Sequence, residues 1–388
     1  MAPSLQRDVC PEKKLLLYCA RSRTRPGLAQ TIRDLTTGEI DWDFLLSDAH
    51  EHCVLPLLER QLRNAAPDAI PSVFAERLKQ EARANAVRCL ALLAELIRVM
   101  ELFESRGVPA IPYKGPAIAA QAYGDITLRE FEDLDIVVRQ RDLAALHEAV
   151  CGVGYEPRFP WIHSSGRPAS LIPGEYNYAN SERRVVLELH TEFTLRHFPI
   201  APRLDDFIER AVKVDLGGRE VATFSPEDAL LFLCVHGAKD FWQKLVWIAD
   251  IAELVQSFPA MDWSAVRRRS AQLRAERMLD LGLALAADLL EVELPPEIEV
   301  QVRSDAVAGG LAAALGANLL ARDSKPMSAR ERFRFRRQLV PGNAAGWHYA
   351  SRLALAPAED DWLLMRLPRP LTPLYFLLRP FRLLRKYG

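Results

Sequence analysis

"KGPAIAAQAYGDITLREFEDLDIVV", from Lys114 to Val138, is the stretch on which the fold and site predictions depend. Within it, Asp133 and Asp135 stand two residues apart and run directly into an apolar segment. Side chains alternate faces along a strand, so both carboxylates would project to the same side, about 7 Å apart. Two carboxylates so close repel each other and need a compensating cation. Carboxylate oxygens suit Mg²⁺, so the stretch predicts a metal-binding strand. The alternative is a solvated strand start paired with Arg129 or Arg139.

A third acidic position lies in "RRVVLELHTEF", residues 183–193. If this segment is a strand, Glu188, His190 and Glu192 share one face, because they are spaced by two. A neighbouring strand that presents Glu188 beside the first pair would complete a site of three carboxylates. His190 has two interpretations, an auxiliary metal ligand or proton carrier, and a hydrogen-bonded structural residue.

The segment Lys114-Gly115-Pro116 falls between a predicted strand at 108–113 and a predicted short helix. Gly115 allows close backbone approach, and Lys114 can hold a phosphate as a point charge. The alternative for Lys114 is an ordinary surface lysine at a strand end. The glycine-rich fingerprints of P-loop and dinucleotide-binding proteins do not occur.

Hydrophobic periodicity divides the chain into four parts and predicts an α+β fold. Residues 1–106 read as a helical region, and 107–222 as a small mixed-sheet core. Residues 223–300 are helical again, and 301–388 form a less regular, basic extension. The expected architecture is a small sheet flanked by helical regions on both sides.

The composition restricts the class of protein. Its 388 residues carry 50 Lys plus Arg against 51 Asp plus Glu, which gives no general attraction to nucleic acid or anionic membranes. Six cysteines without a C-x-x-C pair predict reduced thiols in a cytoplasmic protein. No apolar run is long enough for a transmembrane segment, and no signal peptide is expected at the N-terminus.

A polar stripe is expected on a helix within residues 225–257. His236, Lys239 and Lys244 recur with Asp240 and Gln243 at helical spacing, on one face. Such a stripe can meet a triphosphate or a base across a cleft. The alternative is a solvated face with an Asp240–Lys244 ion pair.

The last part of the chain contains two basic segments. "RERFRFRRQLV" (330–340) interleaves Arg with Phe, but the balanced charge argues against nucleic acid binding. The segment 373–388 is apolar and basic, and Pro380 is predicted to interrupt its helix. It is interpreted as packing on the domain, with peripheral membrane contact as the weaker alternative.

Taken in order, these motifs resemble the signature of the uncharacterised nucleotidyltransferase family, part of the polymerase-β-like nucleotidyltransferase superfamily. The resemblance runs from about residue 40 to 295. The matching residues are Lys114-Gly115-Pro116, Tyr123-Gly124, Arg129, Asp133-x-Asp135, Leu187-Glu188-Leu189-His190, His236, Lys239, Trp247 and Asp250.

The resemblance implies a nucleotidyltransferase core whose cleft is closed by a helical domain. The activity it implies is Mg²⁺-dependent (or Mn²⁺-dependent) transfer of a nucleoside monophosphate from an NTP to an unidentified acceptor. Asp133, Asp135 and Glu188 would hold the metal and carry the catalysis. The nucleotide-binding set would be Lys114, Gly115, Arg129, His236, Lys239 and Lys244. The alternative function is a catalytically degenerate protein of this fold that binds a nucleotide or a partner.

Two positions depart from the usual superfamily pattern. Gly115-Pro116 stands where a Gly-Ser pair is usual, and proline has no N–H to offer a phosphate. Glu188 stands where many members carry Asp. Both departures concern how the triphosphate and its metal are held.

Overall fold

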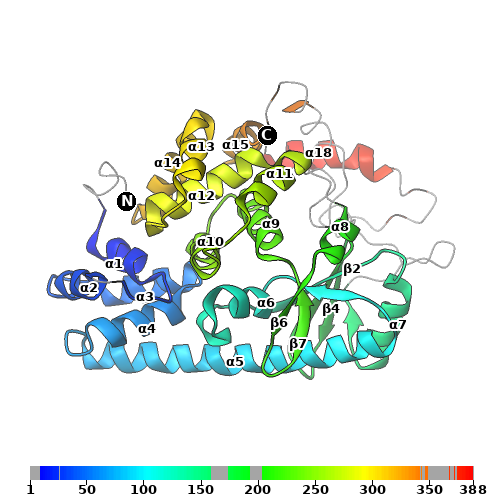
Figure 1. The fold of residues 1–388 in the computed structure, drawn as a ribbon, viewed down its shortest axis with the longest axis horizontal. Helices are drawn as coiled ribbons and strands as arrows, with labels where there is room; N and C mark the ends of the chain where they lie inside the picture. The colour runs from blue at the N-terminus through cyan, green and yellow to red at the C-terminus, as the bar shows by residue number, and fades with distance from the viewer. Residues whose placement is uncertain are drawn as a thin grey trace.

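The computed structural model describes residues 9–25, 27–158, 174–192, 203–340, 342, 346–347, 367, 371 and 374–387. The fold is α+β, as predicted. A five-stranded mixed sheet packs against a long helix, and helices from both ends of the sequence gather beside it (Figure 1).

The sheet has the strand order β1-β2-β5-β4-β3. Strand β2 runs parallel to β5, and the other neighbouring pairs are antiparallel. The predicted strands at 108–113 and 133–138 and the two β-rich segments after residue 174 are confirmed. Their bounds are β1 (Ala110–Pro112), β2 (Asp133–Val138), β3 (Glu156–Pro157), β4 (Glu175–Asn180) and β5 (Val185–His190).

The two faces of the sheet differ in chemistry because side chains alternate along each strand. Leu134 and Ile136 of β2 and Leu187 and Leu189 of β5 are fully buried in one core. That core also contains side chains of α5 (Ser72–Ser105) and α7 (Leu143–Gly152). The intervening positions of β2 and β5 therefore present the acidic side chains on the opposite face.

Helix α5 connects the two cores of the molecule. Its 34 residues contain neither Gly nor Pro, and it ends before Gly107, whose φ is +67°. Phe74 and Leu78 pack with the N-terminal helices, whereas Leu96 and Phe103 pack under the sheet. In Figure 1 α5 extends beneath both groups of elements.

The segment 41–65 forms two separate helices, α3 and α4. Asp41 caps the first helix by accepting a hydrogen bond from the Phe44 N–H, at 3.0 Å. The chain turns at Cys53, whose φ is +54°. The helices of this region are α1 (Pro11–Cys19), α2 (Leu28–Thr36), α3 (Trp42–Glu51) and α4 (Leu55–Ala65).

The helices after the sheet share a hydrophobic core with α1–α4. Figure 1 shows them above the sheet and α5. They are α9 (Pro226–Lys239), α10 (Leu245–Ser257), α11 (Trp263–Leu273), α12 (Glu276–Leu290), α13 (Pro296–Ser304) and α14 (Ala306–Leu320).

The predicted polar stripe on one helix within 225–257 is wrong. Helix α9 ends at Lys239, and Phe241 and Trp242 have φ values of +62° and +51°. The Trp242 N–H donates to the Gly237 carbonyl at 2.9 Å, and its ring lies where a Cβ on Gly237 would come within 2.5 Å. The chain leaves the helix at this contact, and Lys244 is the N-cap of the next helix, which begins at Leu245.

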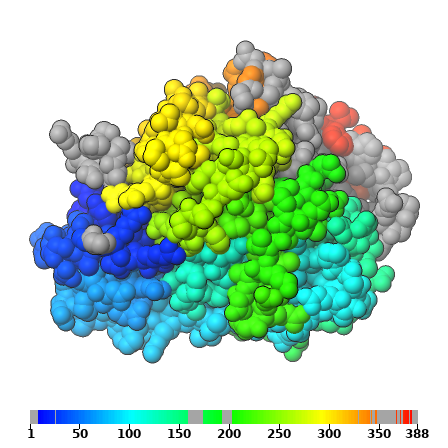
Figure 2. Space-filling view, in the orientation of Figure 1, coloured from blue at the N-terminus to red at the C-terminus, as the bar shows by residue number. Residues whose placement is uncertain are grey.

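Short elements tie the sheet to its surroundings. They are α6 (Pro116–Ile118), η1 (Ala119–Tyr123), η2 (Ile126–Leu128), α8 (Leu204–Glu209), β6 (Val212–Asp215) and β7 (Glu220–Thr223). The β6–β7 hairpin lies on the molecular surface, in green in Figure 2. Thr223 donates from its hydroxyl to the Pro112 carbonyl at 2.7 Å, which joins the hairpin to β1.

The basic segments near the C-terminus are helical. In α15 (Ala329–Gln338), Arg332 and Arg336 lie over the Phe241 ring, 5.3 and 4.5 Å from its centroid. Helix α18 (Tyr375–Tyr387) continues through Pro380, so the predicted interruption is wrong. A proline inside a helix removes only the hydrogen bond that its missing N–H would donate to the carbonyl four residues earlier, here that of Phe376, and a helix can continue past that loss. No helix in the described ranges is long and apolar enough to cross a membrane.

Candidate functional site

Strands β2 and β5 place three of the predicted site residues together on the face of the sheet opposite α5. Asp135 is the register partner of Glu188, and His190 lies two residues further along β5. Asp135 Oδ1 accepts hydrogen bonds from Lys114 Nζ at 2.8 Å and His190 Nε2 at 3.0 Å. His190 Nε2 is also 3.4 Å from Glu188 Oε2. The buried Asp135 carboxylate is thus the centre of a linked group of charges.

Burial and pairing act in opposite directions on these groups. Burial raises the pKa of Asp135, but Lys114 and His190 outweigh it and hold that pKa well below its usual range. Burial likewise lowers the pKa of Lys114, yet the adjacent Asp135 carboxylate holds it well above the ordinary value. The pKa of His190 is raised, because its carboxylate partners outweigh its burial. Asp135 and Lys114 are therefore a charged pair.

Asp133 has a different environment from Asp135, although both lie on the same face. Burial, followed by the charge of Asp135, raises the pKa of Asp133 to about 6. Within the described ranges no hydrogen bond or ion pair to the Asp133 side chain is found. The two aspartates of the D-x-D motif are thus not equivalent.

One group of three side chains in the described ranges has the arrangement of a metal site. The ligand atoms of Asp135, Glu188 and His190 all lie within 4.8 Å of one another. Two carboxylates and an imidazole could hold a divalent metal ion. Mg²⁺ prefers the oxygens, whereas Mn²⁺ also accepts the nitrogen. The predicted metal set was Asp133, Asp135 and Glu188, with His190 as an auxiliary ligand; the group in the structure contains Asp135, Glu188 and His190 but not Asp133.

A cavity of about 210 Å³, here named the sheet cavity, lies next to Asp135. Seven of the predicted site residues line it: Lys114, Gly115, Arg129, Asp133, Asp135, His236 and Lys244. Lys239 is not among the lining residues, and its Nζ lies 3.5 Å from Asp240 Oδ2. The cavity combines the acidic strand with residues from both helical regions.

Gly115 shapes the wall of the sheet cavity. Its φ of +45° and ψ of −117° strain any residue with a Cβ. A Cβ there would lie 3.5 Å from the Asp133 carbonyl and from the Phe131 ring, an ordinary contact, so the backbone angles and not the space favour glycine. This turn allows Lys114 to face Asp135 while α6 begins at Pro116.

Arg129 makes a buried ion pair within the protein. Its Nε and Nη2 donate to the two carboxylate oxygens of Asp250, at 2.9 and 2.8 Å. The Tyr123 hydroxyl donates to the same carboxylate at 2.8 Å. Asp250 belongs to α10, so this group joins the sheet region to the helices above it. Arg129 also lines the sheet cavity, and its contact with a nucleotide stays a prediction.

His236 and Lys244 meet at the cavity from separate helices. Burial, and then the charges of Lys114 and Lys239, hold the pKa of His236 well below its ordinary value, so the ring is neutral. The ring stacks on Phe232, with centroids 5.9 Å apart. Lys244 Nζ lies 3.3 Å from the Cys53 sulfur.

The sequence did not predict several residues that line the sheet cavity. One of them, Cys53, lies at the α3–α4 junction, and another, Arg88, lies on α5. The loop before β2 contributes Glu130 and Glu132. Arg88 is one of many arginines along α5 and carries no local signal. The positive φ of Cys53 follows from the break between α3 and α4, which the apolar pattern did not show.

Comparison with known proteins identifies the family. The sequence model of a family described as "Uncharacterised nucleotidyltransferase" matches residues 38–291, well over half of the chain. No curated protein sequence matches the chain. The matched range contains the sheet, the group of Asp135, Glu188 and His190, and the sheet cavity. The chain therefore belongs to this family of uncharacterised nucleotidyltransferases.

Proposed function

We propose that this protein transfers a nucleoside monophosphate from an NTP to an acceptor hydroxyl, with Mg²⁺ or Mn²⁺ as cofactor. One observation carries the proposal: Asp135, Glu188 and His190 converge within 4.8 Å beside a cavity that contains a buried lysine. The six cysteines are free thiols, which fits a reaction in the reducing cytoplasm.

Asp135 and Glu188 are proposed to hold the metal, with His190 as a third ligand or as the group that orients Asp135. A divalent cation bound there would neutralise charge on the phosphates and lower the pKa of the attacking hydroxyl. Asp133 would add a further carboxylate where the nucleotide enters. In such reactions, side chains act mainly by positioning and electrostatic stabilisation.

Lys114 and Gly115 are proposed to hold the triphosphate. Lys114 is charged, and Gly115, whose φ is +45°, lines the sheet cavity beside it. Lys244 and the neutral ring of His236 line the same cavity and are proposed to contact the rest of the nucleotide. Arg129, held by its ion pair with Asp250, is proposed to fix the part of the cavity wall that it lines.

The experiment is an incubation of the protein with each α-labelled NTP and Mg²⁺ or Mn²⁺, with candidate acceptors and cell extract. Label transfer together with pyrophosphate release is expected for the wild type and not for Asp135→Asn. The matched control is Asp215→Asn, an exposed aspartate of β6 outside the sheet cavity. Nucleotide binding without any turnover in the wild type would instead support the degenerate, binding-only alternative.

A further inference from the structure

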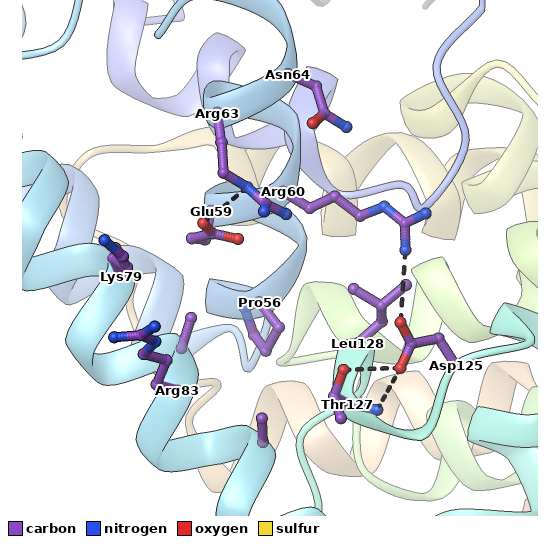
Figure 3. Close-up of a pocket in the computed structure, with 12 residues that line it drawn as sticks. Pro56, Glu59, Arg60, Arg63, Asn64, Lys79, Arg83, Asp125, Thr127 and Leu128 are labelled. Atoms are coloured by element: carbon purple, nitrogen blue, oxygen red, sulfur yellow. Dashed lines mark hydrogen bonds and ion pairs between the residues drawn. The ribbon is translucent and has the colours of Figure 1, made fainter.

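A second cavity, about 530 Å³, lies between α4, α5 and η2 and is here named the basic groove. Figure 3 shows four of the lining side chains, Arg60 and Arg63 on α4 and Lys79 and Arg83 on α5. The complete lining is Pro56, Glu59, Arg60, Arg63, Asn64, Lys79, Ala82, Arg83, Ala86, Asp125, Thr127 and Leu128. Four cationic side chains thus face two carboxylates.

Three of these four cations make an ion pair within the protein, and two of those pairs are long. Arg63 pairs with Glu59 at 3.0 Å, whereas Arg60 lies 3.8 Å from Asp125 Oδ2 and Lys79 lies 3.8 Å from Glu76 Oε2. Asp125 already accepts hydrogen bonds from the backbone N–H and the hydroxyl of Thr127. Within the described ranges, no hydrogen bond or ion pair engages the Arg83 side chain. The groove therefore presents positive charge to a ligand.

The basic groove adjoins the sheet cavity along three chain segments. On α5, Ala86 lines the groove and Arg88 the sheet cavity. Before β2, Leu128 lines the groove and Arg129 the sheet cavity. At the start of α4 the Leu55 N–H donates to Glu130 at 3.1 Å, between Cys53 of one lining and Pro56 of the other. A ligand in the groove would lie beside the nucleotidyl-transfer site.

We propose that the basic groove binds the phosphate of a small phosphorylated acceptor, an inference that rests on the proposed function. Guanidinium groups donate paired hydrogen bonds to phosphate oxygens, and the Arg83 guanidinium has no carboxylate partner within the described ranges. The carboxylates nearest to Arg60 and Lys79 are 3.8 Å away, longer than a direct hydrogen bond. The volume falls within the range of about 300–1,000 Å³ for small-molecule sites. None of the twelve lining residues is aromatic, whereas grooves for single-stranded nucleic acid use aromatic stacking.

The test measures binding of glycerol 3-phosphate and ribose 5-phosphate by calorimetry, with a non-hydrolysable NTP analogue and Mg²⁺ present. Glycerol and ribose serve as uncharged counterparts. A phosphate monoester is expected to bind, and Arg83→Glu or Arg83→Ala to weaken it at least ~10-fold, because a charged hydrogen-bond donor is lost. The matched control is Arg268→Glu on α11, an exposed arginine outside both cavities, which should leave binding unchanged.

Three results would overturn the inference: no binding of either monoester, equal affinity in the Arg83 variants, or displacement of the monoester by the NTP analogue. If a single-stranded oligonucleotide binds more tightly than the monoesters, with the same dependence on Arg83, the ligand of the groove is a nucleic acid and not a small phosphorylated acceptor. Arg83-dependent monoester binding without nucleotidyl transfer would support the groove and count against the proposed function. The failures of the two proposals are therefore distinguishable.

Discussion

The sheet cavity and the basic groove lie side by side but hold their charges differently. In the sheet cavity, the Lys114 and Asp135 side chains are 18% and 2% exposed and lock together at 2.8 Å. In the groove, the Arg63 and Lys79 side chains are 64% and 51% exposed, and their ion pairs join residues of the same helix. The first region holds its charges in a buried pair, whereas the second keeps them exposed to solvent.

The difference in burial of the charged side chains gives the two regions different roles. Buried charges are costly to desolvate, so a protein keeps them only with partners, and they act as preorganised groups. Exposed charges cost little and are screened by salt, so they suit the binding of an anion. Substitutions in the sheet cavity should therefore affect stability and chemistry together, and substitutions in the groove only binding.

The largest effect is expected for Lys114→Met. Removing one partner of a buried ion pair leaves the Asp135 carboxylate without its closest cation, at a cost of about 4 kcal/mol. Urea denaturation should show this loss, and calorimetry a weaker affinity for NTP. Lys213→Met breaks an exposed pair with Glu220 and should change the free energy of unfolding by less than ~1 kcal/mol. Equal losses in the two variants would remove the distinction between the regions.

A buried cluster around His52, the chain neighbour of Cys53 in the sheet cavity, tests whether burial itself has this effect. His52 lies 3.3 Å from Lys13 Nζ and 3.5 Å from Asp48, with Glu51 and Lys244 also near. Burial, and then the charge of Lys13, lowers the pKa of His52 to about 4. Its usual value is 6.5, so between these pH values the unfolded chain binds a proton that the folded chain does not.

Stability should therefore fall as the pH decreases from 6.5 to about 4, with His52 contributing about 3 kcal/mol of the loss. The free energy of unfolding of His52→Asn should depend less on pH over this range. The pKa of Asp48 is raised by burial and acts in the opposite direction, but it is common to both proteins. Parallel pH profiles for the two proteins would show that His52 titrates normally.

The next effect concerns chemistry rather than stability. Glu188→Gln should reduce nucleotidyl transfer by about 100-fold, typical for loss of one positioned electrostatic group. Nucleotide held by Lys114 and Asp135 should still bind, so kcat falls while affinity is retained. Glu192→Gln, on an exposed glutamate beyond the end of β5, is the matched control and should keep full activity. A Glu188→Gln enzyme as active as that control would exclude Glu188 as a metal ligand.

The sheet face that carries Asp135 and Glu188 could be predicted from the sequence, because it depends only on the alternation of side chains along each strand. Alternation along β2 and β5 places Asp135 and Glu188 on one side of each strand, and apolar neighbours fix which side is buried. The pairing of the two strands was a condition that the sequence left open, and the register of Asp135 with Glu188 meets it. The α+β fold followed from the same change of period between helical and strand segments.

The remaining features depend on tertiary contacts that no local pattern contains. The break after α9 requires the Trp242 ring to pack on Gly237. The pairing of Arg129 with Asp250 joins residues 121 positions apart, and the basic groove forms only where α4 and α5 meet. Along each helix taken alone, Arg63 and Arg83 look like ordinary solvated charges.

The smallest effect on stability is expected in the basic groove, with Arg63→Ala. Its pair with Glu59 is an exposed contact four residues apart on one helix, worth about 0.3–0.5 kcal/mol. The free energy of unfolding should change by no more than that, whereas monoester affinity should fall measurably. Raising the salt concentration should weaken monoester binding to the wild type, because exposed charges are screened, and should leave the Lys114–Asp135 pair nearly unaffected. A loss of stability comparable to that of Lys114→Met would mean that the groove is part of the folded core and not a surface ready to bind an anion.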